Sequence, residues 1–187
     1  MPLADFLKEA RRIVDSANDQ GIMLRVMGAT AFRIHCPRFT ALHEAMGRKL
    51  SDIDFMAYSE QRDNVIDLFE KMGYAVSRDR LRLMRYYGRY IFDDPENSRY
   101  ADVFFDKLEM CHTIDFRNRL EIDYPTISLT DLLLEKLQIV KINEKDIKDS
   151  IVLLRAHDIA SFSRETIDAD HISKLLSKDW GFYHTVT

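Results

Sequence analysis

A short apolar stretch near the middle of the chain, SDIDFMAY at residues 51–58, carries two aspartates one residue apart. Its length and hydrophobic residues are typical of a buried β-strand. Asp52 and Asp54 share one face of that strand because side chains two residues apart point the same way. Ile53 and Phe55 point to the other face, toward a core. The chain must therefore form a sheet with one apolar face and two adjacent carboxylates on the opposite face.

The composition describes a globular protein in a reducing environment. The chain has 187 residues, and its 46% of hydrophobic residues are enough for one domain with a core. The net charge of −4 argues against a generally basic nucleic-acid-binding surface. Cys36 and Cys111 lie far apart and form no CxxC motif. Because no apolar run reaches membrane-spanning length and the N-terminal stretch MPLADFLKEARRIVDS is too charged for a signal peptide, we expect a cytoplasmic protein without a membrane partner.

Hydrophobic periodicity divides the first part of the chain into alternating helices and strands. The predicted elements are a helix before Gly21, a strand at 22–28, a helix at 29–36, a strand at 51–58 and a helix at 59–73. The intervening segment 38–49 is mixed in character and is predicted to be a loop.

The pattern changes after residue 74, where aromatic and β-branched residues alternate with charges. This favours antiparallel strands near 74–78, 81–87, 89–93, 100–105 and 110–116. Helical periodicity returns in the last part of the chain, at 130–142, 144–158 and 168–178. The expected fold class is α+β, with a mixed or antiparallel sheet flanked by helices. We expect a core at 1–127 and a helical C-terminal part at 128–187 packed on it.

A third carboxylate on a neighbouring strand would complete a divalent-cation site with Asp52 and Asp54. Paired carboxylates repel each other unless a cation lies between them, and hard oxygen ligands favour Mg²⁺ or Mn²⁺. Asp102 in RYADVFFDK is the stronger candidate, because Asp106 lies about 13 Å further along the same strand face. The alternative is that the first two aspartates are solvated or form an Asx turn, and that Asp102 belongs to a polar strand face.

The sequence VMGATAF, ahead of these aspartates, predicts a strand, a glycine turn and a helix start. Gly28 would let the backbone approach a ligand closely, and the N–H groups of the helix start suit a phosphate. Thr30 adds a hydroxyl. The alternative is a plain strand-to-helix turn with Thr30 as a helix cap. With the aspartates, these residues predict a nucleoside triphosphate site for two-metal phosphoryl or nucleotidyl transfer.

These pieces occur in a distinctive order. A strand, GAT at 28–30 and a helix, then SDIDF at 51–55 and ADVFF at 101–105, resemble the polymerase-β-like nucleotidyltransferase superfamily. That superfamily has a Gly-Gly or Gly-Ser turn, an Asp-x-Asp strand and a third strand aspartate. By this resemblance, the catalytic residues and metal ligands are Asp52, Asp54 and Asp102.

The C-terminal helices extend the resemblance. LLLEKLQIVKINEKDIKDSIVL resembles the helical part of the nucleotidyltransferase toxins of abortive-infection (AbiE-type) systems and of their relatives, where a Glu-Lys precedes a Lys/Arg-Asp-x-x-Asp. It implies that Lys136 contacts the triphosphate with Gly28, Ala29 and Thr30, and that Asp146 or Asp149 lies near the active site. From the residues alone, Lys136 would be a snorkelling helix lysine, and the two aspartates would belong to a solvated helix face.

Two features depart from the superfamily pattern. The second turn position is Ala29 rather than glycine or serine, and the segment before the Asp-x-Asp strand contains the extra residues CPRFTALHEAMGRK. Arg48, near the end of this extra segment, is a further candidate for the site.

The resemblance implies a metal-dependent nucleotidyltransferase that moves a nucleoside monophosphate from an NTP to an acceptor hydroxyl on RNA such as tRNA, on a protein or on a small molecule. The alternative is a weak or inactive module of the same fold that binds nucleotide or a partner protein. A homodimer, or an antitoxin-like partner, is compatible with either hypothesis.

The run SRDRLRLMRYYGRY at 77–90 mixes arginines with aromatic residues. Such a mixture is found where proteins grip nucleic acid. The alternative, which the alternating pattern favours, is the water-facing side of an antiparallel hairpin that carries Arg78, Arg80 and Arg82 on one face.

Overall fold

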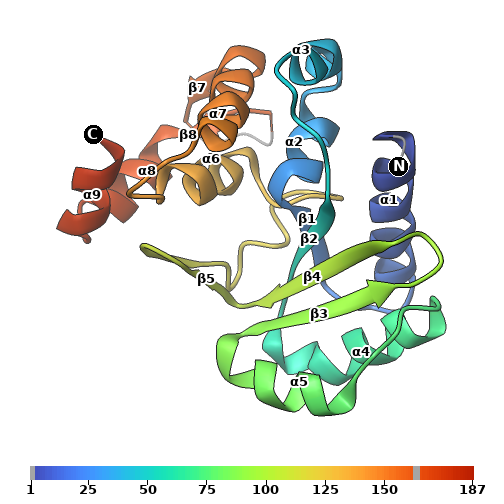
Figure 1. Ribbon diagram of the computed structural model, residues 1–187. Coiled ribbons are helices and arrows are strands. Elements are labelled where there is room, and N and C mark those ends of the chain that lie inside the picture. The colour runs from blue at the N-terminus through green and yellow to red at the C-terminus, as the bar shows by residue number, and fades with distance from the viewer. Residues whose placement is uncertain (1–2, 162–164) are drawn as a thin grey trace.

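A four-stranded mixed sheet organises the chain. The computed structural model describes residues 3–161 and 165–187. The strand order is β1-β2-β4-β3, and the strands are β1 (Leu24–Met27), β2 (Asp52–Ala57), β3 (Arg89–Asp94) and β4 (Arg99–Phe105). The central pair β2–β4 is parallel, whereas β1–β2 and β3–β4 are antiparallel (Figure 1). The chain therefore has the predicted α+β class, with a mixed sheet.

One face of this sheet forms the main core. The helices α1 (Leu3–Asp19) and α4 (Arg62–Lys71) pack on the face that carries Ile53 and Phe55. Phe69 of α4 stacks on Phe92 of β3, with 4.2 Å between ring centroids, and contacts Phe55 edge-on at 6.0 Å. Because these rings fill one face, the carboxylates of β2 are left on the other.

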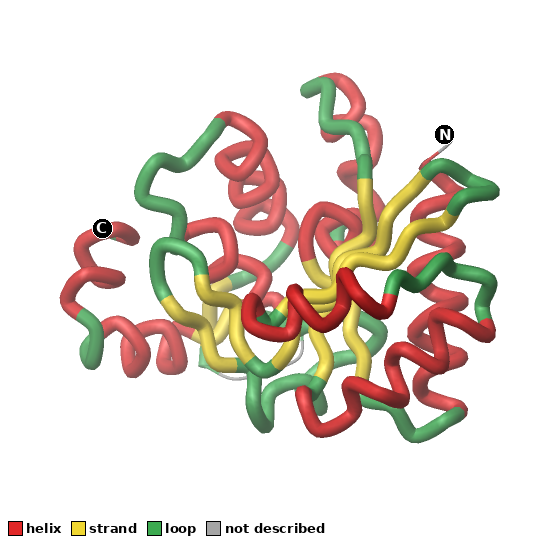
Figure 2. The backbone as a smooth tube through the Cα atoms, turned by 60° about the horizontal axis from the view of Figure 1, so that its bottom comes forward, coloured by secondary structure: helices red, strands yellow, loops and turns green. Residues whose placement is uncertain are grey.

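The remaining elements surround the opposite face and the ends of the sheet. The helices are α2 (Gly28–His35), α3 (Thr40–Ala45), α5 (Arg78–Met84), α6 (Leu129–Leu137), α7 (Glu144–Ala156), α8 (Ala169–Leu176) and α9 (Trp180–Val186). The 3₁₀ turns are η1 (Pro37–Phe39), η2 (Ser59–Gln61) and η3 (Arg85–Tyr87). Two short ladders pair β5 (Lys107–Glu109) with β6 (Thr113–Asp115) and β7 (Ile159–Ala160) with β8 (Ile167–Asp168). The C-terminal helices gather on the side away from α1 and the N-terminus (Figures 1 and 2).

Both edges of the sheet carry one additional bridge from a segment outside the strands. Val26 of β1 bridges Thr126 in parallel, supported by hydrogen bonds to Pro125 O and from Ile127 N. On the other edge, Ala75 bridges Asp93 of β3. Both bridges join residues of the predicted core at 1–127, and the division into two parts stays a prediction.

The structure corrects the strands predicted at 74–78 and 81–87. Only the bridge at Ala75 remains of the first, and the second is replaced by α5 and η3. Arginine, leucine and methionine favour a helix, and Ser77 caps it by accepting a hydrogen bond from Arg80 N at 3.4 Å. Gly88, with φ of 59°, ends η3 in the left-handed conformation. The predicted strand face with Arg78, Arg80 and Arg82 is therefore wrong, and the Arg78 side chain lies outside the described residues.

Two smaller predictions also differ from the structure. The segment predicted as a loop at 38–49 contains α3 after the turn η1, because Pro37 suits the first position of a new helical turn. The strand predicted at 110–116 is shortened to β6, which pairs with β5 outside the main sheet. Among the residues that the structure describes, no helix combines the length and the apolar character needed to cross a bilayer.

The helical assignment of α5 predicts that alanine substitutions at two nearby leucines lower the stability by unequal amounts. Leu81 is 6% exposed and Leu83 is 71% exposed, whereas on a strand both would lie on one face. Leu81→Ala should lower the free energy of unfolding by about 2 kcal/mol or more, because it removes buried apolar contacts. Leu83→Ala should change it by less than about 0.5 kcal/mol. Urea unfolding of both variants measures this, and equal losses would contradict the helix.

Candidate metal and nucleotide site

Three carboxylates from the two central strands meet on the open face of the sheet. Asp54 lies directly opposite Asp102 in the parallel β2–β4 pair, and Asp52 is two residues earlier on β2. One oxygen of each residue lies within 4.8 Å of the others. Asp102 is buried, and the other two are partly buried. The structure thus brings together the three aspartates singled out from the sequence, which we call the carboxylate triad.

The electrostatics of the triad disfavour three free charges. Burial raises the pKa of Asp54 to about 8, with further contributions from Asp52, Glu135 and Asp102. Burial also raises the pKa of Asp102, although Arg89 opposes this shift. Carboxylates this close share protons or need a cation between them. The triad therefore has an unmet demand for positive charge.

The oxygen atoms of the triad fit a divalent cation. Asp102 accepts a hydrogen bond from Arg89 at Oδ2, but its Oδ1 is buried and has no hydrogen-bond partner among the described residues. Asp52 accepts one from Ser51 Oγ at 3.0 Å. A buried carboxylate oxygen without a partner is costly, and an all-oxygen ligand set suits Mg²⁺ or Mn²⁺.

The turn at Gly28 is closely fitted to the triad. Its φ is +64°, and a Cβ at this position would overlap Asp54 Oδ2 and lie 3.0 Å from Asp54 Cγ. The N-cap residue of the helix α2 that starts here, Met27, makes no side-chain hydrogen bond to it. The hydroxyl Thr30 Oγ1 is buried without a hydrogen-bond partner, while Ala29 is partly exposed. The turn thus places a helix start against Asp54, and a buried hydroxyl follows two residues later.

A buried polar chain connects this turn to the C-terminal helices. Glu135 Oε2 accepts a hydrogen bond from Gly28 N at 3.2 Å, and Glu135 Oε1 lies 3.0 Å from Lys136 Nζ. Lys136 Nζ lies 3.3 Å from Asp146 Oδ1. Burial lowers the pKa of Lys136, but Glu135, Asp146 and Asp149 outweigh it and raise that pKa. Lys136 is therefore a charged group held between two carboxylates.

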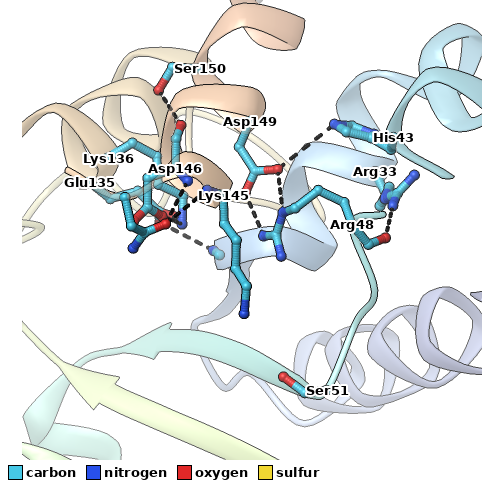
Figure 3. Close-up of polar contacts among 12 residues, drawn as sticks. Arg33, His43, Arg48, Ser51, Glu135, Lys136, Lys145, Asp146, Asp149 and Ser150 are labelled. Atoms are coloured by element: carbon cyan, nitrogen blue, oxygen red, sulfur yellow. Dashed lines mark hydrogen bonds and ion pairs between the residues drawn. The ribbon is translucent and has the colours of Figure 1, made fainter. Parts of the chain in front are cut away.

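Arg48 and Asp149 form a second polar link, which Figure 3 shows beside the first. Arg48 donates two hydrogen bonds to Asp149, at 3.0 and 2.6 Å, and its carbonyl oxygen accepts one from Arg33 at 2.6 Å. Lys148 donates to Met46 O at 2.8 Å. These contacts tie the segment between α2 and β2 to α7. Arg48 and Asp149 thus pair with each other, outside the triad.

Sequence reasoning missed two residues that touch the predicted site. Glu135 accepts a hydrogen bond from the Gly28 turn. The sequence did contain a sign of this role, because an acid inside the apolar run LLLEKL needs a partner when it is buried. Arg89 contacts Asp102 from β3, and no pattern in the sequence indicated that pairing. The rival aspartate, Asp106, lies outside the triad and accepts a hydrogen bond from Ser59 N at 2.9 Å.

Comparisons with known proteins agree with this architecture at the level of the fold. No protein-family model matches the sequence, and no curated protein matches it significantly. The solved structure of the antibiotic-resistance factor ANT(2'')-Ia is similar, with a TM-score of 0.51 and 14% sequence identity. The match covers 95% of this chain and 96% of that chain. The chain therefore has a nucleotidyltransferase-like α+β fold, and the narrower resemblance to the abortive-infection toxins stays a prediction.

The close approach of Gly28 to Asp54 predicts a difference between two glycines. Gly21 has a similar φ of +68° but nothing within 4 Å of its Cβ position. Gly21→Ala should cost about 1–2 kcal/mol of stability through backbone strain alone. Gly28→Ala should cost at least about 1 kcal/mol more, because its methyl group collides with Asp54. Urea unfolding of the two variants measures the difference, and equal losses would contradict the packing described here.

The burial of His43 predicts a pH dependence of stability. Its Nε2 lies 3.9 Å from Asp149 Oδ1, and burial, with Arg33 and Arg48 nearby, lowers the pKa of His43 to about 4. Because the unfolded chain binds this proton near pH 6.5 and the folded chain does not, stability should fall as the pH drops from 6.5 to 4. His43→Gln should reduce that slope by up to about 1.4 kcal/mol per pH unit. Urea unfolding across this range measures it, and an unchanged slope would contradict the assignment.

Proposed function

We propose that the protein is a nucleotidyltransferase that moves a nucleoside monophosphate from an NTP to an acceptor hydroxyl. The observation that carries the proposal is the carboxylate triad, with three oxygens within 4.8 Å of one another beside the Gly28 turn. The nucleotidyltransferase-like fold is compatible with it, but the proposal rests on the site, since function resides in sites rather than in folds. The triad lies on the two central strands of the sheet. Within this class of enzymes, the C-terminal helices resemble those of the abortive-infection toxins.

Asp52, Asp54 and Asp102 would hold the divalent metal, which we propose to be Mg²⁺ or Mn²⁺. When bound, such a metal offsets the charge of the phosphate oxygens and stabilises the charge that develops during transfer. The raised pKa of Asp54 and the unpartnered Oδ1 of Asp102 both support this role, although the other oxygen of Asp102 already pairs with Arg89. A rigid site on two central strands is a suitable frame for these ligands.

The triphosphate would lie at the start of α2. Helix starts attract anions. Here Gly28 N already donates to Glu135, so a phosphate would bind at the N–H groups that follow and at the buried Thr30 hydroxyl, for which no partner is found among the described residues. Lys136 would contact the triphosphate by giving up one of its two carboxylate partners, Glu135 or Asp146. Ala29 offers no hydroxyl at the second turn position, so Thr30 would supply the side-chain contact.

The transfer forms one bond and breaks one. The acceptor oxygen bonds to the α-phosphorus, the bond from this phosphorus to the bridging oxygen breaks, and pyrophosphate leaves. The proton of the acceptor hydroxyl would pass to the carboxylate of Asp102, whose pKa is raised by burial. Positioning of the two reactants accounts for much of the acceleration in such reactions.

A labelled-substrate assay tests this function. We expect the protein, with Mg²⁺ and each α-labelled NTP in turn, to transfer label to a component of an RNA and protein extract. Asp54→Asn and Asp102→Asn should each reduce transfer by at least about a hundredfold, because loss even of outer-shell partners costs 10–100-fold. Asp67→Asn, an exposed aspartate on α4, is the matched control and should transfer normally.

The outcomes separate the enzyme from a binding module of the same fold. Transfer that survives both triad substitutions would refute the assignment of the site. Tight binding of NTP and Mg²⁺ without transfer to any acceptor would favour the module, in which Arg89 already pairs with Asp102 and Lys136 is already paired twice.

A further inference from the structure

A hollow of about 260 Å³ has a lining that is mostly aromatic and basic, with two acids, Asp106 and Glu109. Its lining residues come from the start of α4, from η3, from the end of β4 and from β5. We call the aromatic and basic part of its lining the tyrosine–arginine surface, formed by Arg62, Arg85, Tyr86, Tyr87, Lys107 and Arg117. None of these residues belongs to the triad or to the Gly28 turn.

Two consecutive tyrosines dominate this surface. Tyr86 is 94% exposed and Tyr87 is 82% exposed, at the turn η3 that Gly88 ends. Within the described part of the chain, neither ring stacks on another aromatic ring. Single exposed apolar residues are ordinary, but two adjacent rings with free faces beside a hollow offer a platform for planar ligands.

The cations of this surface are largely unpaired. Arg85 is exposed, and no hydrogen bond or ion pair joins its side chain to a described residue. Arg62 lies over the Phe105 ring, 4.9 Å from its centroid, and its buried Nε has no hydrogen-bond partner. Arg117 differs, because it pairs with Asp115. The four cations of the lining outnumber its two acids, Asp106 and Glu109, in a chain with a net charge of −4, and this local excess favours an anionic ligand.

This surface is continuous with the triad through Arg89. The guanidinium of Arg89 donates to Asp102 Oδ2 and lies over the Phe104 ring, 5.3 Å from its centroid. Phe104 in turn lines the hollow. It is two residues from Asp102 on the same face of β4, a separation of about 7 Å. One end of a ligand bound in the hollow can therefore reach the triad.

The chemistry of the surface selects the class of ligand. Single-stranded nucleic acids bind where aromatic rings stack on bases and basic side chains follow the phosphates. A polycationic small molecule would be repelled by these arginines. A protein acceptor would not require two unstacked rings beside free guanidinium groups. Stacking and phosphate contacts together describe a single strand of nucleotides.

We propose that the tyrosine–arginine surface binds the hydroxyl-bearing end of a single-stranded nucleic acid, which serves as the acceptor. This inference rests on the proposed function. The bases stack on Tyr86 and Tyr87, the phosphates contact Arg62 and Arg85, and the terminal hydroxyl extends past Phe104 to the triad. That hydroxyl then takes the nucleoside monophosphate, while pyrophosphate leaves and the proton passes to Asp102.

Binding is tested first, without NTP. The full-length protein is titrated into a short labelled RNA and into a DNA of the same sequence, and fluorescence anisotropy gives the Kd. The double variant Tyr86→Ala/Tyr87→Ala should raise the Kd for the bound strand at least about tenfold, because each stacked base is lost. Tyr183→Ala, which removes an exposed tyrosine of α9, is the matched control and should bind normally.

The phosphate contacts have a separate signature. Arg85→Gln should reduce the slope of log Kd against log salt concentration by about 0.7 for the lost phosphate contact. Thermal unfolding of all variants should match the wild type, because the substituted side chains are exposed. If neither oligonucleotide binds, or if the tyrosine variant binds as tightly as the wild type, the proposal is overturned.

A transfer assay on the bound oligonucleotide distinguishes this inference from the proposed function. If the wild type labels the strand end, and neither Asp54→Asn nor the tyrosine variant does, the proposed function and the surface assignment are both supported. Binding without any transfer contradicts the enzymatic function and leaves the surface assignment standing. Normal transfer to a protein or a small molecule by the tyrosine variant overturns the surface assignment and leaves the enzyme standing.

Discussion

The parallel pairing of β2 with β4 is the constraint on which the site depends. It sets Asp54 opposite Asp102, and it does so in the interior of the sheet, where both strands are hydrogen-bonded on each side. A slip of one residue would turn Asp102 into the core and leave the β2 pair without a third carboxylate. The aromatic packing of Phe69, Phe92 and Phe55 on the other face opposes that slip.

A second constraint is the buried chain that begins at Glu135. This side chain bonds the backbone of Gly28 and pairs with Lys136, so the turn before α2 and the helix α6 are held by the same carboxylate. Burial raises the pKa of Glu135, and Lys136 counteracts this shift. Because every member of a buried polar network depends on the others, the geometry of the turn is coupled to the C-terminal helices.

Much of the fold and the members of the triad could be predicted from local patterns. The alternation in SDIDFMAY identified β2, and ADVFF identified the strand that carries Asp102. The segment after Ser77 was wrongly predicted to be a strand, because the spacing of its charged and apolar residues is compatible with the period of a strand and with that of a helix. A cap and the burial of Leu81 decide in favour of the helix. The partners of Glu135 and Arg89 could not be predicted, because they depend on tertiary contacts between distant segments.

The bridges at the two edges of the sheet affect the tendency of the protein to self-associate. An exposed edge strand offers unpaired N–H and C=O groups to another chain. Here Thr126 occupies part of the outer edge of β1, and Ala75 occupies part of the outer edge of β3. Each edge is interrupted by a segment of the same chain, so continuous strand addition is blocked. The segments that bridge the two edges of the sheet thus oppose edge-to-edge aggregation.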